Sequence, residues 1–133
     1  KLQLDIQKHA NEITLGLEAL RTDAFVSRLH EKAREQRGMN HEELDYLHDS
    51  FNRNLPHFEK SLRELTHISE TELQVCMLLK LYMTPGEISV LLNKSAGAIS
   101  SIRGRLYQKV FKKKASPIAL ILISALLGAG IYM

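Results

Sequence analysis

The stretch that decides the fold is residues 69–114, SETELQVCMLLKLYMTPGEISVLLNKSAGAISSIRGRLYQKVFKKK. Ser69 with Glu72, and Thr84 with Glu87, have the spacing of a capping box. In that motif the hydroxyl oxygen accepts from a backbone N–H three residues on, and the carboxylate accepts in return. We therefore predict one helix that begins after Ser69 and a second that begins after Thr84.

A third helix is predicted for residues 96–112, with Ser95 as its N-cap after a tight turn at Asn93 and Lys94. Pro85 occupies the first position of the second helix, where its missing N–H costs nothing. Two short helices separated by a turn of this length are typical of a helix-turn-helix.

A helical wheel gives residues 96–112 a buried side and an open side. The predicted buried stripe is Ile99, Ile102, Leu106 and Val110. The opposite side carries Gly97, Ser101, Gly104 and Gln108, with Arg103 and Tyr107 along one edge and Arg105 along the other. A face this small and polar could enter a DNA major groove, with the guanidinium groups reaching phosphates or guanine edges.

Gly97 and Gly104 indicate that another molecule or helix packs closely against the open face. Each costs roughly 1 kcal/mol relative to alanine inside a helix, so a merely solvated face would not favour them. The approaching surface could be DNA or another helix. The charge pattern favours DNA, because residues 103–114 carry six basic side chains and no acidic one, although the whole chain has a net charge of only +3.

Upstream, residues 1–66 are predicted to form a helical arm. The apolar stripe of its first helix lasts under three heptads, so it could be a coiled-coil seam or an ordinary amphipathic face. This stripe consists of Leu2, Ile6, His9, Ile13, Leu17 and Leu20.

Three further helices are predicted in the arm. The first is capped by Thr22 or Asp23 and ends near Gly38. The second begins at a capping box formed by Asn40 and Glu43, and the third begins after Pro56. Their inward-facing residues are Phe25, Leu29 and Ala33, then Leu44, Leu47 and Phe51, then Phe58, Leu62 and Leu65.

Other classes of protein are disfavoured. The single cysteine, Cys76, lies on an apolar helical face and is expected to be inert, and it fits a reduced, cytoplasmic setting. The histidines show no metal-ligand spacing, and neither a phosphate loop nor a nucleophile elbow is present. We therefore predict no enzyme, no catalytic residue, no cofactor, no metal and no small-molecule ligand. Because the chain begins at Lys1, we expect a fragment or processed form.

The segments ISETELQVCMLLKL, TPGEISVLLNKS and AISSIRGRLYQKVFKKKASP resemble the LuxR-type helix-turn-helix. The similarity is greater to the version found at the C-terminus of bacterial regulators that have upstream tetratricopeptide repeats, a membrane span and a coiled coil. The resemblance covers about half of the chain. It implies a transcriptional regulator that binds double-stranded DNA as a homodimer, with the helix at 96–112 in the major groove.

Carried over by position, the resemblance implies a set of DNA contacts on and before this helix. Ser100, Ser101 and Gly104 would approach bases, and Arg103 and Arg105 would contact bases or phosphates. Lys94, Ser95 and Lys109 would hold the DNA backbone. Glu72 and Glu87 would serve as helix caps.

The predicted domains are thus an arm at 1–66, a DNA-binding domain at 67–115 and an apolar C-terminal segment at 116–133. The C-terminal segment differs from the LuxR-type regulators that the chain resembles. They usually continue into a polar fourth helix, whereas this chain has the apolar sequence IALILISALLGAGIYM. We rank it as a packed fourth helix, with a membrane anchor at 118–133 or a sequence artefact as alternatives. The alternative functions are a helical protein-interaction module without DNA binding and a membrane-tethered regulator.

Overall fold

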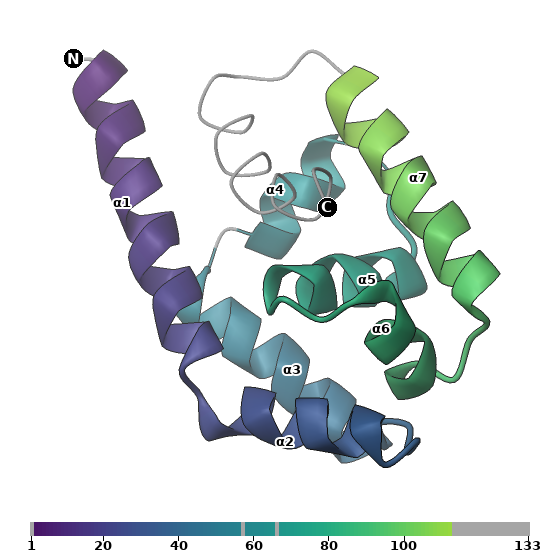
Figure 1. Ribbon diagram of the computed structural model, residues 1–133. Helices are drawn as coiled ribbons and strands as arrows, with labels where there is room; N and C mark the ends of the chain where they lie inside the picture. Colours follow the sequence, from purple (N-terminus) through teal and green to yellow (C-terminus); the bar gives the residue numbers. More distant parts are fainter. Residues whose placement is uncertain (1, 57, 66, 113–133) are drawn as a thin grey trace.

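The structure, a computed structural model, describes residues 2–56, 58–65 and 67–112. Within these ranges it confirms the all-α prediction, with seven helices and no strands. In chain order these are α1 (Leu2–Arg21), α2 (Ala24–Arg34), α3 (His41–Asn54), α4 (Phe58–Leu65), α5 (Glu70–Lys80), α6 (Pro85–Leu91) and α7 (Ala96–Lys112) (Figure 1).

The predicted segment at 116–133, with its fourth helix or membrane anchor, lies outside the described residues. In the part of the chain that is described, no helix combines the length and the apolar character needed to cross a membrane.

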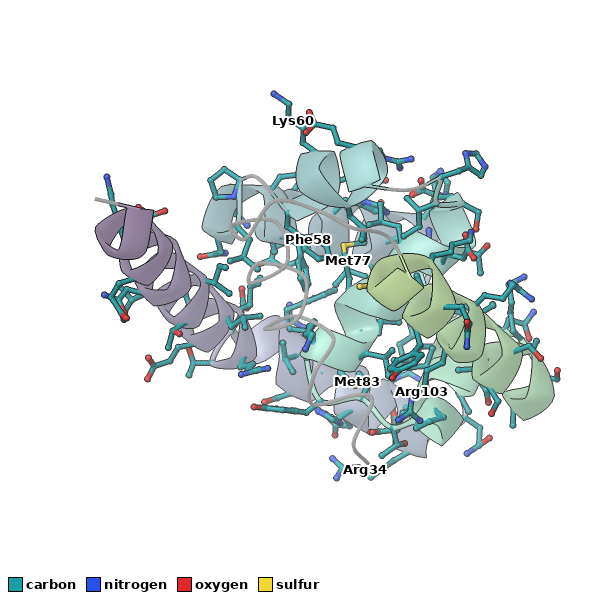
Figure 2. The ribbon with its side chains drawn as sticks, turned by 90° about the horizontal axis from the view of Figure 1, so that it is seen from above. Arg34, Phe58, Lys60, Met77, Met83 and Arg103 are labelled. Carbon is teal, nitrogen blue, oxygen red and sulfur yellow. The ribbon has the colours of Figure 1, made fainter. Side chains whose placement is uncertain are left out.

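Helix α5 forms the centre of the core, with α6 and α7 packed against it (Figure 1). Every residue from Val75 to Leu81 is buried. A helix that is apolar on all sides has to be enclosed by other elements, and the run VCMLL produces such a helix. Met77, Phe58 and Met83 lie inside the molecule, whereas Lys60 and Arg34 project from its edges (Figure 2).

The predicted helix starts are confirmed. Complete capping boxes are present at Asn40, Ser69 and Thr84, each with the glutamate three residues on. Of the two candidates for the start of α2, the N-cap is Asp23, whose carboxylate accepts from the Phe25 N–H. These starts depend on bonds between near neighbours in the chain, which explains why the sequence predicts them well.

The predicted end of α2 near Gly38 is wrong. The helix ends at Arg34, and Gln36 takes the left-handed conformation at φ 59°. The Gln36 N–H donates to the Ala33 carbonyl and the Arg37 N–H to the Lys32 carbonyl, which is a Schellman motif. Burial of Ala33 and these two bonds fix the end of the helix, so a residue other than glycine adopts the left-handed conformation.

The second half of the apolar stripe on α1 packs against other helices of the same chain. Ile13, Leu17 and Leu20 are buried, and α1 packs on α3. At Gly16 the two elements come so close that an added Cβ would lie 2.3 Å from the Asn54 carbonyl oxygen. The side chains of Leu2, Ile6 and His9 are outside the described set, so the coiled coil stays a prediction for that half.

The predicted arm and the predicted DNA-binding domain share one hydrophobic core. Helix α2 packs on α6, and the buried cluster includes residues from both sides of position 66. Arg21, at the end of α1, donates from Nε to the Lys80 carbonyl at 2.9 Å and stacks 3.8 Å from the centre of the Tyr82 ring. The first helix is thereby held against the C-terminal end of α5.

Candidate nucleic-acid interface

Helix α7 is oriented as the wheel predicts. Ile99, Ile102 and Leu106 are buried where α7 packs on α5 and α6. The residues opposite them, Gly97, Ser101, Gly104 and Gln108, are exposed. The side chain of Val110, the fourth residue of the predicted stripe, is outside the described set. The burial of one stripe thus fixes which side of α7 faces outward.

The turn before α7 has the predicted cap. The Ser95 hydroxyl oxygen accepts from the Ala98 N–H at 3.0 Å. Asn93 adopts φ 55°, and the Asn93 and Lys94 N–H groups close a second Schellman motif on the Val90 and Ser89 carbonyls. Lys94 and Ser95 are both exposed at this corner, at the N-terminal end of the outward face.

The outward face of α7 is flat and open. A Cβ added at Gly97 or Gly104 would meet no atom within 4 Å, so nothing in the described fold requires either glycine. Ser101, Gly104, Arg105, Gln108 and Lys109 line a shallow groove of about 510 Å³ along the helix. Ser100 is exposed on the same helix. The structure therefore places most of the predicted contact residues along one face.

The two arginines differ in setting. The Arg105 side chain is 59% exposed and its Nε lies 3.7 Å from a Glu72 carboxylate oxygen. Arg103 is half-buried on the other edge of α7. Arg105 is thus the more exposed of the two guanidinium groups, the kind of group best suited to bind phosphate or guanine.

Lys109 does not have the free ammonium group that a contact to the DNA backbone would need. Its Nζ donates to both Glu72 carboxylate oxygens, at 2.8 and 2.9 Å, and to the His67 carbonyl at 3.0 Å. Glu72 is almost completely buried, so it holds the ammonium against α5. Glu72 is therefore more than the predicted cap, because it also joins α7 to α5.

The setting of Glu72 lowers its pKa. Burial by itself would raise the pKa of this carboxyl, but the Lys109 ammonium and the Ser69 N–H hold it below its ordinary value of 4.5. A carboxyl whose pKa is lower in the folded chain stabilises the fold above its unfolded pKa. That stabilisation is lost as the pH falls through the folded pKa.

We expect Glu72→Gln to lower the free energy of unfolding by about 1–3 kcal/mol near neutral pH, because glutamine can still cap the helix but leaves the Lys109 ammonium without its counter-ion. Urea unfolding followed by circular dichroism measures the loss. The gap to the wild type should close as the pH falls below 4.5, where wild-type Glu72 becomes protonated.

Glu42→Gln is the matched control, since Glu42 is an exposed carboxylate in the first turn of α3. It should cost at most about 1 kcal/mol. A Glu72→Gln loss that equals the control, or that persists undiminished in acid, would show that the ion pair to Lys109 is not what Glu72 contributes.

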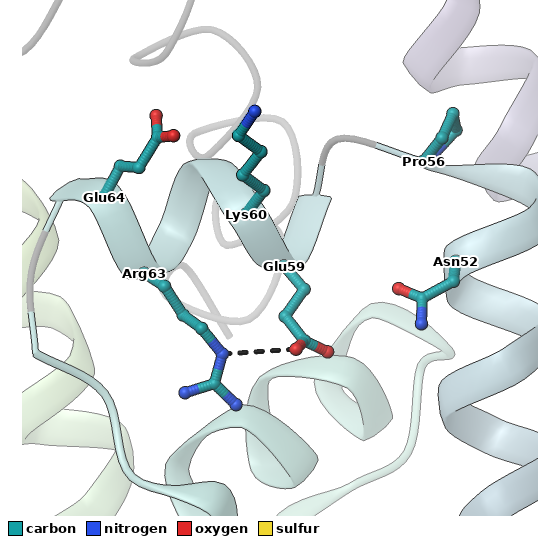
Figure 3. Close-up of a pocket in the computed structure, with 6 residues that line it drawn as sticks. All are labelled: Asn52, Pro56, Glu59, Lys60, Arg63 and Glu64. Atoms are coloured by element: carbon teal, nitrogen blue, oxygen red, sulfur yellow. Dashed lines mark hydrogen bonds and ion pairs between the residues drawn. The ribbon is translucent and has the colours of Figure 1, made fainter.

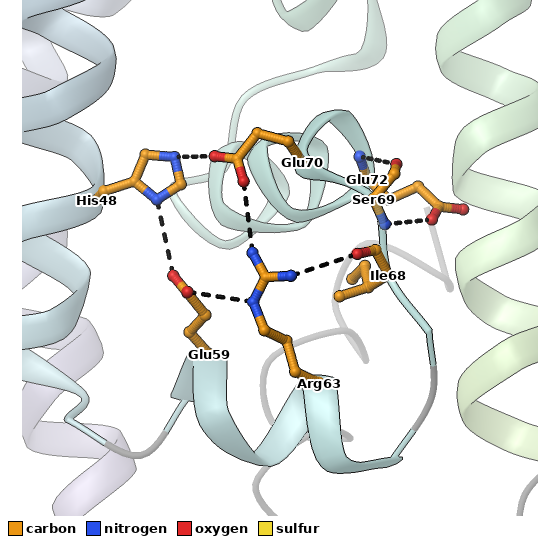
Figure 4. Close-up of polar contacts among 7 residues, drawn as sticks. All are labelled: His48, Glu59, Arg63, Ile68, Ser69, Glu70 and Glu72. Atoms are coloured by element: carbon orange, nitrogen blue, oxygen red, sulfur yellow. Dashed lines mark hydrogen bonds and ion pairs between the residues drawn. The ribbon is translucent and has the colours of Figure 1, made fainter.

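The other polar clusters have structural explanations. His48 Nε2 lies 2.8 Å from a Glu70 carboxylate oxygen, and its Nδ1 lies 3.7 Å from a Glu59 carboxylate oxygen. Arg63 bridges the same two carboxylates (Figure 4). Each of the two carboxylates is therefore engaged by both His48 and Arg63. This network joins α3, α4 and α5, and the described residues contain no group of three side chains arranged to hold a metal.

A second groove lies beside this network, between the end of α3 and α4 (Figure 3). It has a volume of about 460 Å³ and is lined by Asn52, Pro56, Glu59, Lys60, Arg63 and Glu64. Its charges are mixed and Glu59 is already paired with Arg63. The groove is open to solvent, whereas small-molecule sites are typically enclosed.

Cys76 is confirmed as a core residue. It is fully buried on α5, and burial raises the pKa of its thiol to about 12. The reactive thiolate is therefore not accessible near neutral pH.

Comparisons of the chain with protein-family models, with curated proteins and with solved structures gave no match. The function has to be inferred from the residues and their geometry.

Proposed function

We propose that this protein is a DNA-binding transcriptional regulator that acts as a homodimer. In this proposal α6 and α7 form a helix-turn-helix supported by α5, and α7 enters the major groove. The protein has no catalytic role in this proposal, and it needs neither a cofactor nor a metal. The proposal also agrees with the resemblance to LuxR-type regulators.

The observation that carries the proposal is the outward face of α7. In a helix of 17 residues, two glycines lie on the exposed side with no atom within 4 Å of an added Cβ. Gly104, in the interior of the helix, costs about 1 kcal/mol relative to alanine, and no contact in the described fold offsets this cost. A partner that approaches the helix backbone would explain both glycines.

DNA fits this face better than another helix does. A helix would need apolar side chains to pack against, whereas the groove along α7 presents Ser101, Gln108 and the Arg105 guanidinium. Small polar residues between two arginines can hydrogen-bond to base edges while the arginines hold phosphates. We assign Ser100, Ser101 and Gly104 to the bases, Arg103 and Arg105 to bases or phosphates, and Lys94 and Ser95 to the backbone.

Lys109 would contribute little to the DNA contact, since Glu72 already neutralises it. It would orient α7 by holding its last turns against α5. Lys109 thus has a structural role in this proposal, and the other proposed contact residues on α7 keep theirs.

The test is a fluorescence anisotropy titration of the full chain with a labelled DNA duplex of mixed sequence at several salt concentrations. Arg103→Ala and Arg105→Ala should each weaken binding by roughly fivefold or more. If the lost contact is to a phosphate, the slope of log affinity against log salt should become shallower by about 0.9. Lys60→Ala, which removes an exposed charge on α4, should leave affinity and slope close to wild type.

The competing protein-interaction module predicts a different result. Wild type and both arginine variants would then bind the duplex equally weakly, and the salt slope would not separate them from Lys60→Ala. That outcome would contradict the proposed function.

A further inference from the structure

The connection between α2 and α3 is anchored beside the turn that precedes α7. The Met39 N–H donates to the Leu91 carbonyl, the last residue of α6, at 2.8 Å. An added Cβ at Gly38 would lie 3.4 Å from the Val90 carbonyl oxygen and 3.6 Å from that of Leu91. The two connections therefore lie at the same corner of the molecule (Figure 1).

Helix α2 is held firmly in this position. Its buried residues, Phe25, Val26, Leu29 and Ala33, join the common core. On its flank, His30 Nδ1 lies 2.6 Å from a Glu87 carboxylate oxygen on α6. The orientation of the end of α2 relative to α6 is thus fixed by packing and by a polar contact.

Two arginines project from this end, Arg34 and Arg37, and both are exposed. We call them the α2 shoulder. The Arg37 Nη2 contacts Glu35 at 2.6 Å, in a pair whose side chains are at least half exposed. Surface pairs of this kind are weak, so a phosphate can compete for the guanidinium.

The shoulder lies on the same side of the molecule as Arg103. Seen from above, Arg34 lies at one edge of the molecule and Lys60 at the opposite edge, and Arg103 lies within the outline on the Arg34 side (Figure 2). Lys94 lies on the turn between α6 and α7, next to the carbonyls that hold the α2–α3 connection. Lys94 and the α2 shoulder therefore flank the same corner of the molecule.

The nearby acids limit what this surface can bind. Glu31 and Glu35 are exposed on and after α2, while Glu87 is engaged by His30 and Thr84. The shoulder therefore offers two separate guanidinium contacts and no broad positive field. Spaced phosphates on a DNA strand suit two such contacts, because each guanidinium can bind one phosphate in a bidentate manner.

We propose that the α2 shoulder binds phosphates of the DNA backbone that flank the base pairs contacted by α7. This inference rests on the proposed function and extends the interface to α2, which precedes the helix-turn-helix in the chain. Arg34 and Arg37 clamp the backbone without reading sequence, and α2 sets the orientation of the whole fold on the duplex.

The test uses one double variant of the full chain, Arg34→Gln with Arg37→Gln. Its binding to the same labelled duplex is measured by anisotropy across a salt series. We expect affinity to fall by about fivefold to fiftyfold, and the log–log salt slope to become shallower by up to about 1.8 for two phosphate contacts. The loss should be similar on duplexes of different sequence. The matched control is Lys8→Gln with Lys60→Gln, which removes the same charge from exposed positions on α1 and α4.

The outcomes separate this inference from the proposed function. If Arg103→Ala weakens binding while the shoulder variant matches the Lys8 and Lys60 control, the shoulder is overturned and the proposed function stands. If the wild type does not bind the duplex, both are overturned. An equal loss in the shoulder variant and the control would show a general charge effect and would also overturn the shoulder.

Discussion

Gly16→Ala is expected to lower the free energy of unfolding by about 2–3 kcal/mol, although alanine is the better helix former. The added Cβ would lie 2.3 Å from the Asn54 carbonyl oxygen and 2.6 Å from Leu55 Cδ2. The nearer atom belongs to the backbone, so the conflict can be relieved only by moving α1 away from the end of α3. That movement would loosen the packing of Ile13, Leu17 and Leu20.

Urea unfolding measures the change, and Gly104→Ala is the matched control. The same substitution at Gly104 meets no atom within 4 Å, so it should raise the free energy of unfolding by about 0.5–1 kcal/mol. Equal stability gains for both variants would show that α1 does not approach α3 as closely as the structure has it.

The second large effect is expected at Lys80, which is completely buried in the last turn of α5. Burial lowers the pKa of its ammonium from 10.5 to about 8, partly offset by the nearby Cys76, with Arg21 lowering it further. A shift of this size corresponds to roughly 3 kcal/mol against the charged form. Lys80→Met keeps the length of the side chain and removes the buried charge, but it also leaves the hydrogen-bond partner of Nζ unsatisfied. It should therefore raise the free energy of unfolding by about 1–2 kcal/mol near neutral pH.

The stability gain from Lys80→Met depends on pH. Between pH 8 and 10.5 the unfolded chain binds the Lys80 proton more tightly than the folded chain, so the wild type becomes more stable as the pH rises. The advantage of Lys80→Met should therefore shrink over that range in a series of urea titrations. Lys60→Met, at an exposed position, should show almost no change, and a Lys80→Met protein that is less stable than the wild type near neutral pH would contradict the account.

Local signals in the sequence were sufficient to predict where helices begin and which side of α7 is buried. Ser69 with Glu72, and Thr84 with Glu87, form bonds within one turn, and Ile99, Ile102 and Leu106 repeat at the helical period. Such features depend on neighbours a few residues apart, which are present in any single sequence.

Features that depend on distant partners could not be predicted in this way. The close approach at Gly16 needs the position of Asn54, and the burial of Lys80 needs the helices that surround α5. The Glu72–Lys109 ion pair joins residues 37 positions apart, so the sequence showed only a cap and a basic residue. Glycine often marks a helix end, so the sequence predicts that α2 ends near Gly38, whereas Gln36 takes the left-handed conformation in the structure.

The measurement that tests the central claim most directly is the DNA affinity of Gly104→Gln. This substitution removes no charge and fills open space on α7, so it should leave the fold at least as stable as the wild type. If α7 enters the major groove through this face, the new side chain should weaken binding to the labelled duplex by about tenfold or more, a loss of roughly 1.4 kcal/mol. Ala19→Gln, at an exposed position on α1, should bind as the wild type does. A folded Gly104→Gln protein with wild-type DNA affinity would contradict the account.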